Sequence, residues 1–116
     1  SEVEFLPLYI SQPLFGDICS FLKSKNISFH KFLNLSGRTL KPITFKNNLN
    51  FATQHIWSDG VFVKDILKIP DLSNQQLLKL AIFTYLYNSP DLTFYCLENF
   101  DKKNNAKIID AYKKIL

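Results

Sequence analysis

The chain has 116 residues and a formal net charge of +4 at pH 7, and 47% of its residues are hydrophobic, among them eleven Phe and five Tyr. This length and composition indicate one folded domain or part of one, and they argue against a disordered chain. The lysines are scattered in blocks no longer than two. The charge therefore predicts an ordinary solvated surface rather than a nucleic-acid site.

Targeting and redox features of the sequence suggest a cytoplasmic protein. No apolar run approaches the roughly 18 residues of a membrane-spanning helix, and the first residues lack the basic segment and cleavage site of a signal peptide. Cys19 and Cys96 are far apart and form no C-x-x-C motif, which is typical of thiols in a reducing compartment. We expect neither a membrane nor a nucleic acid among the partners.

The stretch Val3–Phe15 (VEFLPLYISQPLF) predicts a central strand that leads into a helix. It begins with polar and apolar residues in alternation and then becomes apolar on both faces, as in a strand covered from two sides. Pro13 starts a helix that we expect to run to about Lys25, and Asn26 ends it. A second strand over Ile27–Leu33 completes a compact strand–helix–strand unit.

The middle of the chain predicts two further extended segments. Leu40, Ile43 and Phe45 alternate around Pro42, a pattern that suits an edge strand. Ile56–Val63 also predicts a strand, in which Gly60 marks a bulge or a close backbone approach.

After Pro70 the pattern becomes helical. Ser73 and Gln76 form a capping box for a helix to about Tyr87. A second helix is expected over 89–99, and Asn105 is expected to cap a last one. The sequence thus divides into an α/β part over 1–66 and a helical tail over 67–116.

The extended segments together resemble the C-terminal part of the FkbM-type methyltransferases, which transfer a methyl group from S-adenosylmethionine to a hydroxyl, often on a sugar or polyketide. The resemblance runs from Val3 to about Phe100, with Asn26 where the family pattern has Gly. It is carried by VEFLPLYISQPLF (Val3–Phe15), the Phe21-Leu22 helix face leading into FHKF (Phe29–Phe32), LKP (Leu40–Pro42), WSDGVFVKD (Trp57–Asp65) and LSNQQLLKLAIF (Leu72–Phe83).

This resemblance implies a fold and a cofactor site that lies outside these 116 residues. The expected fold class is α/β, the C-terminal half of a Rossmann-like sheet. Val3–Tyr9 and Ile27–Leu33 would be neighbouring parallel strands, Trp57–Val63 an antiparallel last strand, and the final helices a small tail. The family binds its cofactor in an N-terminal half, on a glycine-rich loop and an acidic residue that these 116 residues do not contain. S-adenosylmethionine is thus expected in the full-length protein and not on this chain alone.

On this placement, five residues would converge on a substrate groove: Tyr9, Gln12, His55, Trp57 and Asp59. Asp59 or His55 would accept the proton of the acceptor hydroxyl as the methyl group arrives. Trp57 would stack on a sugar or aromatic substrate, and Tyr9 and Gln12 would contact it. The alternatives stay open: Asp59 as a turn cap before Gly60, His55 as an ordinary loop residue, Trp57 as core, and Tyr9 and Gln12 as hydrogen-bonding residues at a strand end. No metal site is expected, because the two His have no ligand-like spacing.

A second hypothesis belongs to another functional class. The chain could be a non-catalytic protein-interaction or dimerisation module that keeps an α/β core, and an exposed apolar patch on the sheet edge or helical tail would favour that hypothesis. The expected partners are accordingly a small-molecule or carbohydrate substrate, or a second copy of the chain in a homodimer.

Overall fold

The structure is a computed structural model of the 116-residue chain and describes residues 1–41 and 52–116. Contacts divide the chain into two compact units, Ser1–Lys64 and Asp65–Leu116. Most of the edge strand expected around Pro42 lies outside the described residues.

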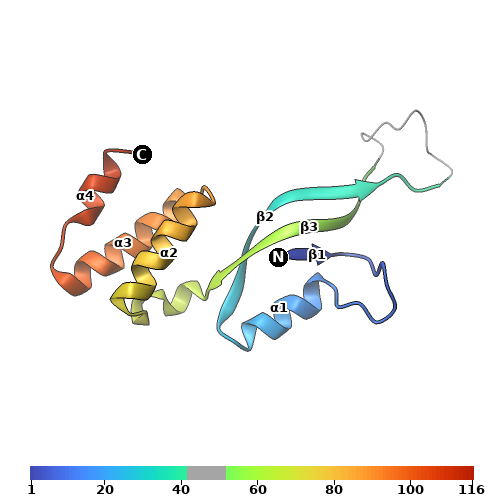
Figure 1. The fold of residues 1–116 in the computed structure, drawn as a ribbon, viewed down its shortest axis with the longest axis horizontal. Coiled ribbons are helices and arrows are strands. Elements are labelled where there is room, and N and C mark those ends of the chain that lie inside the picture. The colour runs from blue at the N-terminus through green and yellow to red at the C-terminus, as the bar shows by residue number, and fades with distance from the viewer. Residues whose placement is uncertain (42–51) are drawn as a thin grey trace. The chain divides into compact units, whose positions relative to one another are not determined.

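The described residues of the first unit form a three-stranded sheet with one helix. Its elements are β1 (Glu2–Glu4), α1 (Phe15–Lys23), β2 (Ile27–Arg38) and β3 (Gln54–Lys64). The strand order is β1-β3-β2, and β3 runs antiparallel to both neighbours (Figure 1). The long strands β2 and β3 form a hairpin, and the short β1 pairs with the middle of β3.

This arrangement corrects the predicted fold class. We expected neighbouring parallel strands in the C-terminal half of a Rossmann-like sheet, but β3 separates β1 from β2, and all pairing in the described residues is antiparallel. The physical reason is that β2 and β3 are 12 and 11 residues long, so each satisfies the other's backbone groups along most of its length. The antiparallel orientation predicted for the last strand is confirmed.

The first strand is also much shorter than predicted. We expected a central strand over Val3–Tyr9, but β1 ends at Glu4 and is an outer strand of this sheet. Pro7 has no N–H to donate to a strand ladder, and the apolar residues beyond it are exposed, with Ile10 99% accessible to solvent. Apolar character in this stretch therefore does not reflect burial between two layers.

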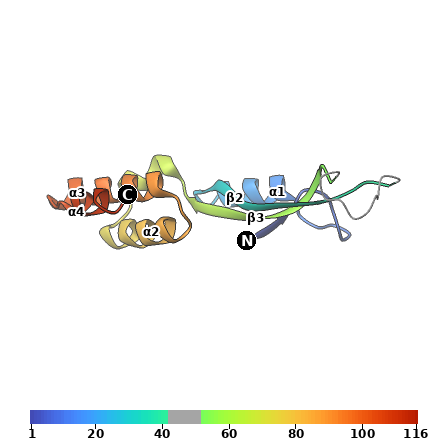
Figure 2. The same ribbon diagram turned by 90° about the horizontal axis from the view of Figure 1, so that it is seen from above.

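An aromatic cluster joins α1 to one face of the sheet, and Figure 2 shows the helix lying over that face. The ring centroid of Phe15 on α1 lies 5.7 Å from Phe5, 5.0 Å from Phe29 and 5.2 Å from Phe32. These T-shaped and tilted arrangements are the favourable ones for aromatic pairs. Asn26 follows the helix with a φ of 59°, which confirms the predicted left-handed residue.

Of the two features predicted at Gly60, a bulge or a close backbone approach, the register shows an irregularity of the bulge type, between the pairs Phe32–Gly60 and Leu35–Ser58. A Cβ atom at this position would lie 3.0 Å from the Phe62 ring and 3.5 Å from a methyl group of Val3. Gly60 is buried, and Val3 is fully buried beside it. The absence of a side chain at Gly60 therefore leaves room for the Phe62 ring of the same strand, while the 3.5 Å to Val3 is an ordinary van der Waals distance.

The second unit consists of helices. They are the 3₁₀ helix η3 (Ile66–Asp71) and the α-helices α2 (Asn74–Leu86), α3 (Pro90–Asn104) and α4 (Ile108–Lys113). The predicted capping box of α2 is confirmed, since the Gln76 N–H donates to Ser73 Oγ at 3.2 Å and the Ser73 N–H donates to Gln76 Oε1 at 3.0 Å. The buried apolar residues of this unit are Ile69, Leu72, Leu77, Ala81, Leu92, Cys96, Leu97 and Tyr112.

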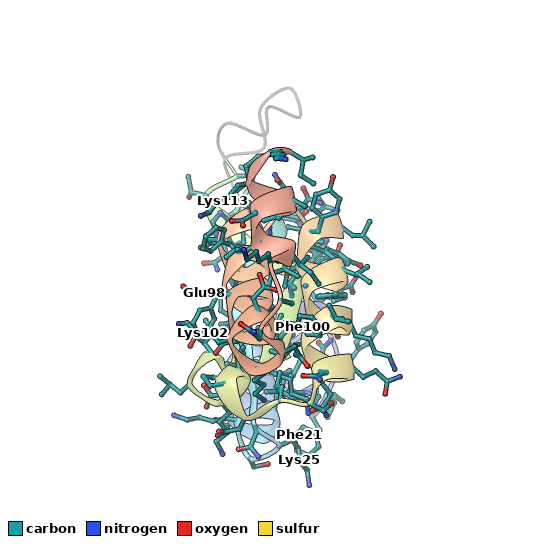
Figure 3. The ribbon with its side chains drawn as sticks, turned by 90° about the vertical axis from the view of Figure 1, so that its left-hand side faces the viewer. Phe21, Lys25, Glu98, Phe100, Lys102 and Lys113 are labelled. Atoms are coloured by element: carbon teal, nitrogen blue, oxygen red, sulfur yellow. The ribbon has the colours of Figure 1, made fainter. Side chains whose placement is uncertain are left out.

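Helix α3 is longer than predicted and determines where α4 begins. It ends at Asn104 rather than Asn99, and Asn105, with a φ of 50°, terminates it instead of capping the next helix. Figure 3 shows Glu98 and Lys102 together on α3, where they form an exposed ion pair of 3.7 Å. In residues 1–41 and 52–116, the helices are all too short or too polar to cross a membrane.

Candidate functional site

The strand register brings three strand ends to one end of the sheet. Glu4, at the carboxyl end of β1, pairs with Trp57, and Arg38, at the carboxyl end of β2, pairs with Gln54. Trp57 has Ser36 of β2 on its other side. The carboxyl ends of β1 and β2 therefore lie beside the amino-terminal part of β3 (Figure 1). By the register, β1 and β2 lie on either side of Trp57.

Polar residues and Trp57 share the sheet face that points away from α1. Directly paired residues of antiparallel strands point to the same face, and successive residues alternate. The pairs Glu2–Asp59 and Glu4–Trp57 therefore lie on one face, and Val3 lies on the other with the aromatic cluster. This arrangement gathers three carboxylates beside the chain's single tryptophan.

Arg38 stacks on Trp57. Its guanidinium carbon lies 4.9 Å from the centroid of the Trp57 ring, and its Nη1 donates a hydrogen bond of 3.3 Å to the carbonyl oxygen of Gly37. Trp57 is half-buried and Arg38 is exposed. A guanidinium held against an aromatic ring is pre-organised, so less freedom is lost when it binds a ligand oxygen.

Glu4 has a perturbed carboxyl group at this site. Burial raises the pKa of Glu4, and a hydrogen bond with the Glu2 side chain and repulsion from its charge raise it further. A carboxylate with a raised pKa is a better proton acceptor than an ordinary surface glutamate. Glu4 can therefore receive a proton beside the Trp57 ring.

The structure places the five sequence-predicted site residues in two groups. Asp59 lies inside β3 and not in a turn, on the same face as Trp57, and both Asp59 and His55 are exposed. His55 pairs in register with Gly37. Tyr9 and Gln12 lie in the segment between β1 and α1, where Gln12 Oε1 accepts a hydrogen bond of 2.7 Å from the Leu8 N–H. The Gln12 side chain thus has a role within its own loop.

Sequence reasoning missed the residues that flank Trp57. The alternation of Glu2 and Glu4 with apolar residues favoured solvent exposure or pairing with Lys over a catalytic role, because the pairing of β1 with β3 is not visible in sequence. Arg38 is the only arginine of the chain, and that fact was the one available signal. The stacking on Trp57 depends on how β2 pairs with β3.

The site holds no arrangement of metal ligands. In the part of the chain that the structure describes, no three or more His, Cys, Asp or Glu side chains lie close enough together to hold a metal ion. Comparisons with known protein families, curated proteins and solved structures gave no match to this chain.

Proposed function

We propose that this chain is the substrate-side part of an S-adenosylmethionine-dependent O-methyltransferase that acts on a hydroxyl of a small molecule or sugar. The observation that carries the proposal is the position of Trp57, which has Glu4 across from it on β1 and the Arg38 guanidinium stacked on its ring. The resemblance of the sequence to the FkbM-type enzymes from Val3 to about Phe100 supports the same function.

The chemistry of these side chains suits a polyhydroxylated ligand. An aromatic ring packs against the apolar face of a sugar ring, and carboxylate and guanidinium groups bind its hydroxyls by charge-assisted hydrogen bonds. Here Trp57 would supply the ring, Arg38 would donate, and Glu2, Glu4 and Asp59 would accept.

The reaction also needs a group that accepts the hydroxyl proton. Glu4 is the favoured acceptor because its pKa is raised by burial and by Glu2. Asp59 on the same face and His55 nearby in β3 are the other candidates. S-adenosylmethionine supplies an electrophilic methyl group, and we propose that residues outside this chain bind it.

The single tryptophan allows ligand binding to be tested directly. Because Trp57 is the only Trp, the tryptophan emission of this chain, excited at a wavelength that tyrosine does not absorb, reports on this site alone. We expect a panel of methyl glycosides to include at least one that quenches or shifts the emission saturably, while S-adenosylmethionine alone leaves it unchanged.

Variants separate binding at the site from a general effect. Arg38→Ala and Glu4→Gln should each weaken the glycoside response by about tenfold, the loss that one charge-assisted hydrogen bond predicts. Lys23→Ala, an exposed change on α1, should leave it unchanged. A panel without any saturable response, or equal responses in all variants, would rule out a sugar site around Trp57.

The second functional class, a protein-interaction module, is favoured by a different observation. The helical unit exposes a groove and several large apolar side chains, among them Ile82, Tyr85 and Ile115.

A further inference from the structure

Helix α2 has more apolar surface than its own unit covers. Its thirteen residues include one charged side chain, Lys79, and apolar residues occur all around the helix. Such a helix is typically buried on all sides. Only Leu77, Ala81 and Thr84 are buried here, so most of the apolar surface of α2 is accessible.

Exposed apolar residues of α2 and of the turn that follows α4 surround a groove. The groove has a volume of about 200 Å³ and is lined by Ala81, Ile82, Tyr85, Thr93, Leu97, Tyr112 and Ile115. Leu86 lies one turn beyond Ile82 on the same side of α2. The solvent-accessible fractions are 63% for Ile82, 56% for Tyr85, 72% for Leu86 and 67% for Ile115. We call these four residues, together with the groove, the α2–α4 surface.

We propose that the α2–α4 surface binds a second copy of this chain and forms a two-fold symmetric dimer. This inference is independent of the proposed methyl transfer. A two-fold interface brings the same surface of both copies together, so that surface must be complementary to itself. The α2–α4 surface combines a hollow with exposed apolar side chains, Ile82 in its lining and Leu86 one turn further along α2, and insertion of each copy into the other requires this combination.

The charge distribution favours an identical partner over a charged one. The four exposed residues are uncharged, and α2 has no acidic residue and a single lysine. These four apolar side chains give an acidic or basic partner no pairing, and burying a partner's charge against them would be costly. Lys79 lies one turn before Ile82 on the same side of α2, is exposed and can keep its ammonium group in water. A second α2–α4 surface is apolar as well, so it brings no unpaired charge into the interface. Two α2 helices that run antiparallel across the two-fold axis would also align their dipoles favourably.

The available area is sufficient for a weak dimer. Burying a large apolar side chain removes on the order of 100 Å² or more from water, so the four residues expose roughly 300 to 400 Å² per copy. In homodimer interfaces about 65% of the buried area is apolar. The apolar area that the two copies contribute then corresponds to a total buried interface of roughly 1,000 to 1,200 Å². This area is at the lower limit for specific interfaces, so we expect dissociation in the micromolar range.

Sedimentation-velocity analysis of the full 116-residue chain between about 1 and 200 µM tests the proposal. We expect a reversible change from a 13.5 kDa monomer to a dimer of twice that mass. Ile82→Glu and Leu86→Glu should each raise the dissociation constant at least 100-fold, because both place two like charges near the axis. Leu67→Glu is the matched control, since Leu67 in η3 is 85% exposed and lies outside the α2–α4 surface.

Three results of this experiment would overturn the dimer proposal. A wild-type chain that stays monomeric to 200 µM would overturn the proposal and leave a different apolar partner as the occupant of the surface. A dimer that persists in both α2 variants, or that Leu67→Glu dissociates equally well, would also overturn it. Circular dichroism of each variant separates loss of dimer from loss of fold, and the three substituted side chains are exposed, so the fold should be retained.

Discussion

The carboxylate of Asp101 on α3 accepts a hydrogen bond of 2.9 Å from the backbone N–H of Ile109 in the first turn of α4. Its other oxygen accepts from the N–H of Ile108 at 3.1 Å. Asp101 is 91% buried, given its accessibility of 9%, and it satisfies two of the N–H groups that a helix start leaves without partners. One side chain thus connects α3 to α4.

Replacing this cap should destabilise the helical unit. Asp101→Asn keeps the size but removes the negative charge and one acceptor, so we expect a loss of about 1 to 3 kcal/mol in the free energy of unfolding. Urea unfolding followed by circular dichroism measures it. Asp110→Asn, an exposed change in the first turn of α4, should cost less than about 0.5 kcal/mol. Equal losses in the two variants would contradict the capping role.

The aromatic cluster should stabilise the sheet unit. Phe15→Ala removes the ring that lies against Phe5, Phe29 and Phe32, and because Phe15 is half-buried we expect a loss of about 2 kcal/mol. Phe21 on the same helix is 62% exposed, and Lys25 lies over its ring at 6.0 Å (Figure 3). Phe21→Ala is therefore the matched control, with an expected loss below about 0.5 kcal/mol. Chemical unfolding of both variants decides whether the cluster holds α1 in place.

Two glycines should respond in opposite directions to substitution by alanine. A Cβ at Gly37 would lie 2.3 Å from the carbonyl oxygen of Gln54, so Gly37→Ala must displace the β2–β3 pairing and should cost about 1 to 3 kcal/mol. A Cβ at Gly16 on α1 meets no atom within 4 Å, so Gly16→Ala should stabilise the protein by about 0.4 to 1 kcal/mol. Thermal unfolding of the two variants is sufficient, and a Gly37→Ala protein as stable as the wild type would contradict the register.

Cys96 should make stability depend on pH in the alkaline range. Burial raises the pKa of the Cys96 thiol from its ordinary value of 9.0 to about 11. The folded state then holds the thiol proton more tightly than the unfolded state does. The resulting contribution to stability is fully present below pH 9 and is lost as the pH rises from 9 to about 11.

A variant isolates this contribution from other alkaline titrations. The difference in free energy of unfolding between the wild type and Cys96→Ala should shrink between pH 8 and pH 10.5. Native Cys96 should also react with thiol reagents only on unfolding, because its side chain is fully buried. A pH-independent difference together with rapid labelling would show that the thiol is accessible.

Local sequence signals predicted the local structure well. The capping box at Ser73 and Gln76 and the left-handed residue at Asn26 depend on interactions that a few neighbouring residues determine. The ends of the helices were predicted less accurately. The end of α3, for example, depends on the hydrogen bonds that the Asp101 carboxylate accepts from the first residues of α4.

The strand pairing and the candidate site were harder to predict than these local features, because both depend on contacts between residues that are far apart in the sequence. The prediction of parallel neighbours assumed that strands joined by a helix pair directly, but β3, more than 50 residues after β1, pairs between them. The position of Glu4 and Arg38 around Trp57 follows from that long-range pairing. Sequence could therefore identify Trp57 and Asp59 as candidates without identifying the residues beside them.

The most direct test of the proposed function is methyl transfer by the protein as its source cells produce it, isolated with an antibody against this chain. It would be incubated with S-adenosylmethionine that carries a labelled methyl group and with the glycosides that alter Trp57 fluorescence. If the chain is part of a methyltransferase, we expect a protein heavier than 13.5 kDa that transfers the labelled methyl group to a hydroxyl of the glycoside. A protein of 13.5 kDa that transfers no label would contradict it and leave interaction as its function.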